Sequence, residues 1–214
     1  MAPRVLQDKY GFENPFRTDP LTKKASRYCS GKRLLDVGCG EGADSTFFAK
    51  KGFHVTSFDK NPTYLKRFRA YRRDNHLESI RILERSALAY SYPTKKFDVV
   101  ICLLVLCCMK KTEFEKMLPV LKGSVKPGGV IIMSARNYLD PEFQQYRRTS
   151  KEIEPNTFQH KDKCCNYLYF IEKNRLREMF DDFEILYYNE GFAPCKYDEH
   201  PIHGDSSIIC RRRL

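Results

Sequence analysis

The sequence predicts an α/β fold with a doubly wound, mostly parallel seven-stranded sheet and an antiparallel edge strand. Three observations support this prediction. Short apolar runs alternate with helical patterns along most of the chain, as in a series of βα units. A glycine-rich turn breaks the first apolar run and leads directly into a helical pattern. The chain ends in a pair of strand-like runs, residues 183–188 and 207–210, which we expect at one edge of the sheet.

Length and composition are those of one ordinary domain. The 214 residues are 42% hydrophobic, which is enough to bury a real core. We expect a mobile N-terminal arm at residues 1–17 and a single domain at residues 18–214. The longest apolar run, residues 99–109, is far shorter than the roughly 20 residues that a membrane span needs. No apolar leader follows the first methionine, so we expect a soluble cytoplasmic protein without a membrane partner.

The nine cysteines do not resemble a secreted disulfide scaffold. Their number is odd, and Cys102 and Cys107 stand in strand-like apolar surroundings, which favours free thiols in a reducing compartment. No C-x-x-C pair is present, and we expect no metal site. Cys164 and Cys165, together with His160, leave a soft-metal site as an alternative to free loop thiols.

The glycine-rich turn is the main functional signal. Residues 33–37 form an apolar run that ends at Gly38 and Gly40, and glycine is required where the backbone takes positive φ or a ligand comes close. A helix that begins just beyond such a turn points free N–H groups at the ligand. The second run, residues 54–58, ends in Asp59. An acid about 20 residues after the turn can accept both hydroxyls of a ribose, so the ligand should contain a nucleoside.

The spacing of the glycines separates the nucleoside cofactors. A dinucleotide site uses G-x-G-x-x-G, whereas this turn has Gly38, Gly40 and Gly42, with Ala43 at the third position of that pattern. The segment Asp-Val-Gly-Cys-Gly-Glu-Gly instead resembles the first motif of the class I S-adenosylmethionine-dependent methyltransferases. A nicotinamide dehydrogenase and a ligand-free α/β domain are the alternatives. The resemblance implies S-adenosyl-L-methionine as the cofactor, bound by Asp36, Gly38, Cys39, Gly40, Gly42, Asp59 and Lys60.

The helices are predicted from their caps. Asp19-Pro20 opens a helix that runs to about residue 29, and Asn61-Pro62 opens another that runs to about residue 75. Basic residues surround the apolar face of this second helix, which indicates a solvated surface. Thr112 and Glu115 have the spacing of a capping box at the start of a later helix, and a further helix is predicted at residues 174–180.

The remaining strands are predicted at residues 80–83, 97–101 and 130–133. In class I methyltransferases the adenine ring lies just after the third strand, where this chain has Ser86 and Ala87. The fourth strand should end within residues 103–108 and border the cofactor from the other side, with Leu103 as the predicted contact, because ligands of parallel sheets lie beyond the carboxyl ends of the strands. The Lys-Pro-Gly-Gly turn at residues 126–129 also resembles this class. Residues 137–165 lose all periodicity, so we expect a substrate-side loop there.

Over nearly its full length the chain resembles the tellurite-resistance (TehB-like) methyltransferases. The resemblance rests on Asp-Lys-Tyr-Gly at residues 8–11, the glycine block, the turn at residues 126–129, and Tyr-Asn-Glu at residues 188–190. It implies a cytosolic enzyme that methylates oxyanions of tellurium and selenium, or related soft nucleophiles. Where the family has Gly-Arg-Asn-Ser after the glycine block, this chain has Ala43 and Asp44 in the middle positions, which removes a cation and adds an anion.

Methyl transfer from a sulfonium is an in-line displacement whose leaving group is already activated. The protein mainly has to position the two reactants, which can contribute roughly 7–11 kcal/mol. No catalytic triad is needed, and a nucleophile that arrives deprotonated needs no general base. We expect Tyr10 from the arm and His203 or His200 from the last turn to close the pocket, with a histidine contacting the acceptor. A solvated turn position is the alternative for both histidines.

The predicted function is transfer of a methyl group from S-adenosylmethionine to a small soft nucleophile, either a tellurite- or selenite-type oxyanion or a thiol. The net charge of +11 leaves an RNA methyltransferase, acting on a cap or a tRNA base, as an alternative. Aromatic residues are not interleaved with the basic residues as a base-stacking surface requires. A third hypothesis is a non-catalytic S-adenosylmethionine-binding protein.

Overall fold

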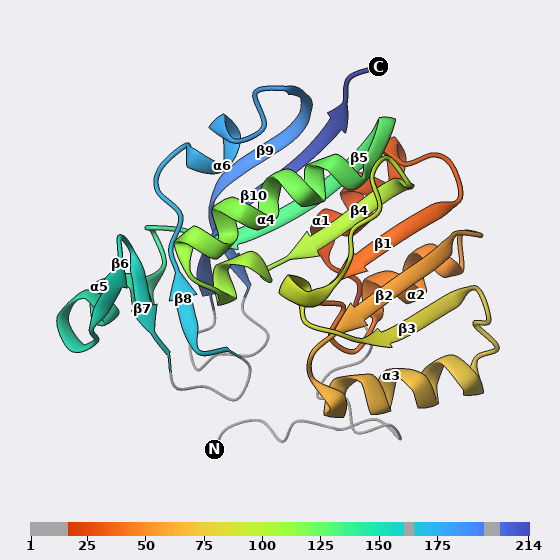
Figure 1. The fold of residues 1–214 in the computed structure, drawn as a ribbon, viewed down its shortest axis with the longest axis horizontal. Coiled ribbons are helices and arrows are strands. Elements are labelled where there is room, and N and C mark those ends of the chain that lie inside the picture. The colour runs from red at the N-terminus through yellow and green to blue at the C-terminus, as the bar shows by residue number, and fades with distance from the viewer. Residues whose placement is uncertain (1–16, 161–164, 195–201) are drawn as a thin grey trace.

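The protein is built around one seven-stranded sheet, and the computed structural model describes residues 17–160, 165–194 and 202–214. The strand order is β3-β2-β1-β4-β5-β10-β9 (Figure 1). These strands are β1 (Arg33–Val37), β2 (His54–Asp59), β3 (Ile80–Glu84), β4 (Phe97–Leu103), β5 (Val125–Arg136), β9 (Phe183–Pro194) and β10 (Ile202–Arg212). All neighbours from β3 to β5 pair in parallel, and β10 is antiparallel to both β5 and β9. The predicted fold class is confirmed, with the antiparallel strand lying next to the edge strand β9.

Helices cover both faces of the sheet. They are α1 (Pro20–Ala25), α2 (Ala43–Ala49), α3 (Pro62–Asp74), α4 (Lys111–Ser124), α5 (Pro141–Thr149) and α6 (Arg175–Glu178), with 3-10 turns η1 (Ser26–Tyr28), η2 (Ala87–Ala89) and η3 (Leu106–Cys108). Apolar residues of α1, α2 and α3 pack on one face, against Leu34 and Val99. Those of α4 and α6 pack on the other face, against Leu35 and Val100. No helix of the described residues has the length and apolar character needed to cross a bilayer.

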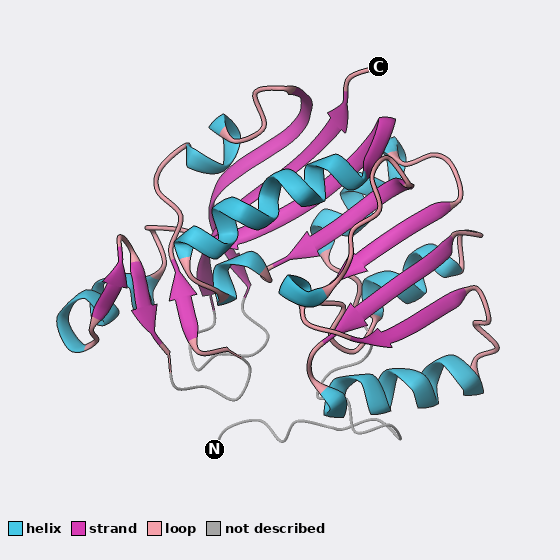
Figure 2. Cartoon of the chain, viewed as in Figure 1, coloured by secondary structure: helices cyan, strands magenta, loops and turns pink. Residues whose placement is uncertain are grey.

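The prediction of a loop at residues 137–165 is wrong. This part of the chain forms α5 and the strands β6 (Glu152–Glu154) and β7 (Thr157–Gln159), which pair with β8 (Tyr167–Tyr169) in a small antiparallel sheet (Figure 2). The small sheet has its own apolar core, made by Phe143, Phe158, Cys165, Leu168 and Phe170. Each strand is only three residues long, and such short strands carry too few alternations for the period of two to stand out.

Helix α4 begins earlier than its predicted capping box. The Glu113 carboxylate accepts a hydrogen bond from the backbone N–H of Lys110 at 3.0 Å, so Glu113 and not Glu115 closes the box. Thr112 bonds elsewhere, because its backbone N–H and its hydroxyl both donate to the Glu154 carboxylate of β6 at 2.9 Å. A tertiary contact with the small sheet thus replaces the local one that the sequence suggested.

Asp98 connects the amino-terminal ends of three strands. Its Oδ2 accepts hydrogen bonds from the backbone N–H groups of Lys32 at 3.0 Å and Arg33 at 2.8 Å, and its Oδ1 accepts one from Lys126 Nζ at 2.6 Å. Partial burial alone would raise the pKa of Asp98, but the bonds from Lys126, Arg33 and Lys32 outweigh it and hold that pKa below its usual value. The ionised carboxylate therefore fastens the starts of β1, β4 and β5 together.

Asp98→Asn should destabilise the fold at neutral pH. The amide is a weaker acceptor and keeps no charge for Lys126, so we expect a loss of about 1–2 kcal/mol in the free energy of unfolding, measured by urea denaturation at pH 7. A depressed pKa contributes stability above the unfolded pKa that is lost as pH falls through the folded value. The variant should therefore approach the wild type below about pH 4.

The matched control is Asp74→Asn, which changes an exposed carboxylate that forms an ion pair with the neighbouring Arg73 at the end of α3. It should stay within about 0.5 kcal/mol of the wild type at all pH values. Equal urea midpoints for the Asp98 variant and the wild type at pH 7 would contradict the structural role of Asp98.

Candidate cofactor and acceptor site

The glycine turn lies at the carboxyl end of β1, between β2 and β4 in the middle of the sheet. The backbone N–H of Cys39 donates to the carbonyl of Phe58 in β2 at 3.0 Å, and the N–H of Gly42 donates to the carbonyl of Cys39 at 2.9 Å. Helix α2 starts at Ala43, directly after the turn. This is the strand, turn and helix arrangement that the sequence predicts for a nucleoside site.

The three glycines of the turn differ in what surrounds them. All have positive φ: +63° at Gly38, +53° at Gly40 and +82° at Gly42. A Cβ at Gly38 would lie 2.4 Å from a methyl carbon of Val105, and one at Gly42 would lie 2.2 Å from the Phe68 ring. A Cβ at Gly40 would meet no atom of the described residues within 4 Å. Gly38 and Gly42 are thus required by packing, whereas Gly40 presents open backbone to any ligand at the turn.

Asp59 faces this open glycine. Its Oδ2 accepts a hydrogen bond from the backbone N–H of Gly40 at 3.0 Å, and its Oδ1 accepts one from the N–H of Asn61 at 2.8 Å. Both bonds leave lone pairs on a half-buried carboxylate at the end of β2, which suits two ribose hydroxyls. Lys60, the next predicted contact, is exposed. An open glycine next to a carboxylate in this register fits a nucleoside cofactor.

Asp36 lies beneath the turn and belongs to a buried polar group. The residue is buried, with only 3% of its surface exposed. The Ser45 hydroxyl donates a hydrogen bond to Asp36 Oδ2 at 2.5 Å and also contacts Ser57 Oγ at 2.6 Å. Burial raises the pKa of Asp36 to about 7, helped by the charges of Asp44 and Asp59 and opposed by the Ser45 hydrogen bond. The Asp36 carboxyl group therefore changes its protonation state near neutral pH.

Cys39 contributes bulk and not charge to the turn. Burial, together with the nearby Asp36 and Asp59 carboxylates, raises the pKa of its thiol well above the usual value. The thiol thus stays protonated, and its nearest hydrogen-bond acceptor is the carbonyl of Gly40 at 3.7 Å. A neutral thiol beside the turn can contact a ligand but cannot act as a nucleophile at neutral pH.

The predicted adenine and β4 contacts lie on either side of the turn. Ser86 and Ala87 are half-buried at the start of η2, just after β3, and Ser86 Oγ accepts a hydrogen bond from the N–H of Leu88 at 3.3 Å. Leu103 is the last residue of β4 and is also half-buried. Leu104 follows with a left-handed φ of 54°, which turns the chain away from the sheet at this point.

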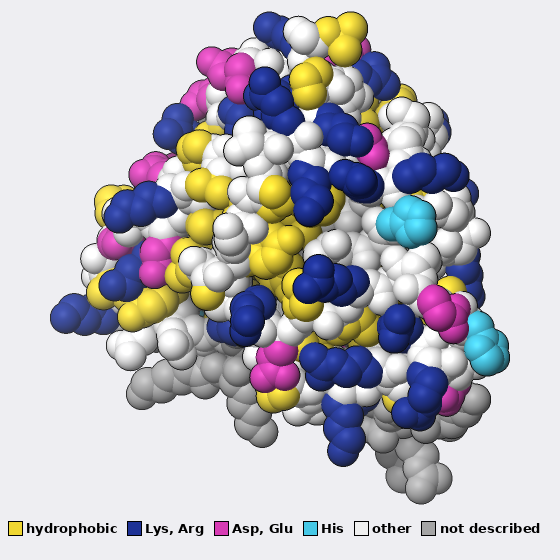
Figure 3. Space-filling view, turned by 45° about the vertical axis from the view of Figure 1, so that its right-hand side comes forward, with side chains coloured by type: hydrophobic (Ala, Val, Ile, Leu, Met, Phe, Trp, Pro, Cys, Tyr) yellow, Lys and Arg dark blue, Asp and Glu magenta, His cyan; other side chains and the backbone are white. Residues whose placement is uncertain are grey.

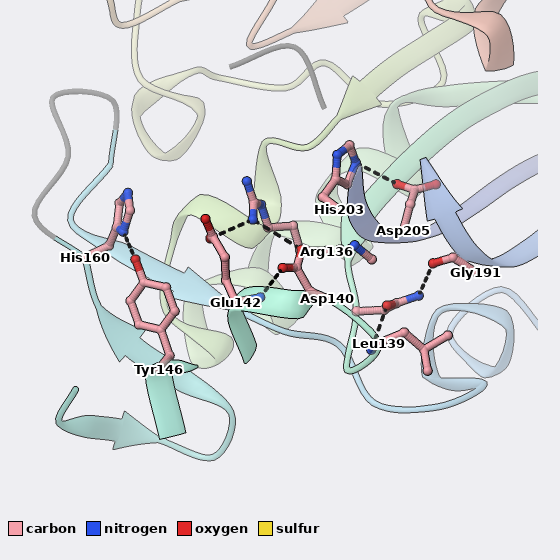
Figure 4. A network of polar contacts seen from close by, with 11 residues as sticks. Arg136, Leu139, Asp140, Glu142, Tyr146, His160, Gly191, His203 and Asp205 are labelled. Atoms are coloured by element: carbon pink, nitrogen blue, oxygen red, sulfur yellow. Dashed lines mark hydrogen bonds and ion pairs between the residues drawn. The ribbon is translucent and has the colours of Figure 1, made fainter. Parts of the chain in front are cut away.

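A buried polar network lies near the end of β5 and the start of β10 (Figure 4). His203 is 5% exposed, and its Nε2 lies 3.8 Å from Oδ1 of Asp205. Arg136 Nη1 contacts Asp140 at 3.2 Å and Glu142 at 2.9 Å. Because β10 runs antiparallel to β5, Asp205 pairs with Arg136 and both lie at the edge where β4 and β5 end. This edge is where an acceptor would approach the methyl donor.

Asn137 ties this network to β9 and β10. Its amide group donates to Ser206 Oγ at 3.2 Å and to the Gly191 carbonyl at 3.5 Å, and its Oδ1 accepts from the N–H of Leu139 at 3.0 Å. The sequence prediction omitted Asn137, Arg136 and Asp205. Their signal was their position, since Arg136 and Asn137 follow a predicted strand and Asp205 stands two residues after His203.

Several predicted residues lie outside the described part of the chain. These are Tyr10, with the rest of residues 8–11, and His200 and Cys164. His160 Nδ1 is hydrogen-bonded to the Tyr146 hydroxyl, and Cys165 packs in the core of the small sheet. Within residues 17–160, 165–194 and 202–214, no three histidine, cysteine or acidic side chains are grouped to hold a metal ion.

Gly40→Ala should weaken cofactor binding while the protein stays folded. The new Cβ would project into the open space beside Asp59, where the nucleoside is expected, and the left-handed backbone costs alanine about 1–2 kcal/mol. We expect at least a tenfold higher Kd for S-adenosylmethionine, measured by calorimetric titration. Gly123→Ala is the matched control, because its Cβ also meets nothing within 4 Å but lies in α4. Equal affinities for both variants would contradict this placement of the ligand.

Asp36→Asn should flatten the dependence of stability on pH. The folded pKa of Asp36 is about 7, and the unfolded value is about 3.9. Between these values the folded state holds a proton that the unfolded state lacks, so stability falls as pH rises. Asp36 should contribute a loss of about 2 kcal/mol between pH 5 and pH 7 to the free energy of unfolding of the wild type, measured by urea denaturation. The Asp36→Asn variant should lose clearly less stability over this pH range. Parallel curves of stability against pH for variant and wild type would contradict the raised pKa of Asp36. Asp74→Asn is the control and should keep the wild-type slope.

Comparison with known proteins agrees with this geometry. The profile of the family described as "Methyltransferase domain" matches residues 34–129. A ubiquinone biosynthesis O-methyltransferase of Rickettsia felis is 31% identical over 127 residues, which is 58% of this chain and 50% of that protein. The chain thus spans about half the length of the curated relatives it matches.

Solved structures with the same fold cover nearly the whole chain. TehB from Haemophilus influenzae superimposes with a TM-score of 0.72 at 20% identity, over 92% of this chain and 63% of that one. A SAM-dependent methyltransferase from Methanosarcina mazei gives 0.71 at 20% identity, over 88% of this chain and 96% of that one. At this identity the likeness concerns the fold. With the glycine turn and the match over residues 34–129, we conclude that the chain has the fold of the class I S-adenosylmethionine-dependent methyltransferases, with S-adenosylmethionine as the methyl donor.

Proposed function

We propose that the chain transfers a methyl group from S-adenosylmethionine to a small soft nucleophile, a thiol or an oxyanion of the tellurite or selenite type. The observation that carries this proposal is the open Gly40 backbone facing the Asp59 carboxylate at 3.0 Å, at the carboxyl ends of the central strands. The cofactor supplies an activated methyl group when bound. The chain then has to hold the two reactants in line, which needs no metal and no covalent intermediate.

The cofactor residues have separate tasks in this proposal. Asp59 accepts the ribose hydroxyls, Gly40 lets the cofactor approach the backbone, and Cys39 and Lys60 flank it. Asp36 adjusts the charge under the turn, since its ionised form complements a cationic cofactor. Gly38 and Gly42 keep the turn between Val105 and Phe68, and Ser86, Ala87 and Leu103 border the adenosine.

The acceptor side supports a small substrate. Asn137, Asp140 and His203 are nearly or fully buried near the end of β5 and the start of β10, so the described side chains at this edge are closely packed. In the described residues of this network the carboxylates of Asp140, Glu142 and Asp205 outnumber the guanidinium of Arg136. A net negative environment opposes any anion, so it favours a thiol that enters in its neutral form and loses its proton in the site over a thiolate or an oxyanion that enters charged.

A second candidate is methylation of a hydroxyl group. The nearness of His203 Nε2 and Asp205 Oδ1, at 3.8 Å, supports it, because a carboxylate beside an imidazole helps the ring to take up a proton. The matched relatives are named as O-methyltransferases of ubiquinone biosynthesis. Tyr10 and His200 remain proposed acceptor contacts on sequence grounds alone. The division into an arm at residues 1–17 and one domain at residues 18–214 also remains a proposal from the sequence.

A methyl-transfer assay with labelled S-adenosylmethionine tests these proposals. Thiols, phenols, tellurite, selenite and total RNA are offered in parallel, and volatile and retained label are counted separately. We expect label on a small acceptor, and we expect Asp59→Ala to raise the cofactor KM roughly 100-fold through the loss of charge-assisted hydrogen bonds worth about 3 kcal/mol. Asp74→Ala, an exposed carboxylate of α3, is the control and should behave as the wild type.

His203→Gln separates the two acceptor classes. If the acceptor is a hydroxyl, the variant should lose about 100-fold in kcat through loss of the base, and the loss should shrink at high pH. If the acceptor is a thiolate or an oxyanion, kcat should change less than tenfold. Label found only on RNA would overturn the small-acceptor proposal, and cofactor binding without any labelled product would favour a non-catalytic S-adenosylmethionine-binding protein.

A further inference from the structure

Basic side chains gather at one edge of the main sheet. Beside the edge strand β3, the exposed bases Lys66, Arg69, Arg73, Arg81 and Arg85 outnumber the exposed acids Asp74, Glu78 and Glu84. Beside the opposite edge strand β9, the exposed acids Glu178, Asp181, Asp182 and Glu184 stand among the exposed bases Lys173, Arg177 and Arg213. The net charge of +11 is therefore not spread evenly over the molecule. A field of this kind orients an approaching polyanion toward the β3 edge.

Helix α3 presents a stripe of bases at this edge. Lys66, Arg69 and Arg73 follow one another at spacings of three and four residues, so they lie on one face of the helix, and all are exposed. Arg69 Nη1 is 4.0 Å from Oε2 of Glu84, the last residue of β3, and both side chains are about half exposed. This long, solvated pair joins the stripe to the edge strand without neutralising it strongly.

Strand β3 adds bases and an aromatic ring to the same edge. Arg81 lies within β3 and Arg85 directly follows its last residue, and both side chains are exposed. Tyr90, which follows η2, is stacked on Phe58 with ring centroids 4.5 Å apart and meets the Tyr92 ring at 4.9 Å. It is half-buried, and it lies close enough to Arg81 for that charge to act on its hydroxyl. The fold thus brings together bases and aromatic rings that the sequence keeps apart.

Figure 3 shows this side of the molecule, with α3, β2 and β3 turned forward. Lys and Arg side chains are the most frequent charged groups in this view and border the hydrophobic side chains near its centre, while Asp and Glu lie mostly toward the margins. The surface also adjoins the cofactor turn, because Arg67 Nη1 of α3 binds Oε1 of Glu41 at 2.8 Å and the α3 cap Asn61 binds Asp59.

We propose that this β3-edge surface, formed by Lys66, Arg69, Arg73, Arg81, Arg85 and Tyr90, binds a single-stranded nucleic acid. The bases contact successive phosphates, and the Tyr90 ring offers a face on which an unpaired nucleotide base stacks. A duplex has no free base faces to stack in this way, which is why a single strand is the ligand. The inference concerns binding and goes beyond the proposed function, since it holds whichever molecule accepts the methyl group.

The test is fluorescence anisotropy with a labelled 20-nucleotide RNA of mixed sequence, titrated with the full chain over a range of salt concentrations. We expect log Kd to rise steeply with log salt. Lys66→Ala with Arg81→Ala and Arg85→Ala should weaken binding more than tenfold and lower the salt slope by about 2, since each phosphate contact on a single strand contributes about 0.7. Tyr90→Leu should weaken binding about tenfold without changing the slope, and Tyr90→Phe should bind as the wild type.

The matched control removes the same charge from the opposite end of the molecule, as Lys151→Ala with Lys173→Ala and Arg177→Ala, all exposed positions. It should bind within about twofold of the wild type. Equal weakening by both triple variants would overturn the proposal, because net charge alone would then explain binding. No binding by the wild type would also overturn it, as would tighter binding to vesicles of anionic lipid than to RNA. Circular dichroism of each variant confirms folding, and the methyl-transfer assay is a separate readout.

Discussion

The structure depends on how tightly the glycine turn is packed between two neighbouring elements. Gly38 lies against Val105 after β4, and Gly42 lies against the Phe68 ring of α3, each so closely that a Cβ would overlap its neighbour. These two contacts fix the turn from both sides and leave Gly40 alone with an open face. The sheet order then supplies the rest, because it places the end of β2, with Asp59, next to that face. The open backbone at Gly40, which the proposed cofactor would approach, is thus a result of packing at Gly38 and Gly42.

Most of the cofactor half could be predicted from the sequence. The apolar runs, the glycine spacing and the acid after the second run are all local signals, and each corresponds to one short piece of β1, α2 or β2. The fold class followed from the order of these pieces. What the sequence could not separate was the reason for each glycine. Whether a glycine serves packing or a ligand depends on Val105 and Phe68, which are distant in the chain.

The acceptor half was predicted less well, and the reason is also physical. Its contacts are long-range: Asn137 reaches Ser206, Thr112 reaches Glu154, and Arg136 pairs with Asp205 across two strands. A single residue has no periodic pattern from which such a distant contact could be predicted. The small sheet was missed because its strands are short, and its core at Phe143 and Phe158 forms only when separate segments meet. Tyr10 and His200 lie outside the described residues, so their predicted roles stay predictions.

The reversed direction of β10 has a consequence for how such a protein can diversify. Because β10 runs against its neighbour β5, it brings its beginning and not its end to the edge that faces the cofactor. The profile match stops at residue 129, before most of β5 and all of β10. In the proposed function, the donor-binding and acceptor-binding residues therefore lie in consecutive stretches of the chain. On that proposal, a change in length between β9 and β10 would alter the acceptor side and leave the donor-binding segment as it is.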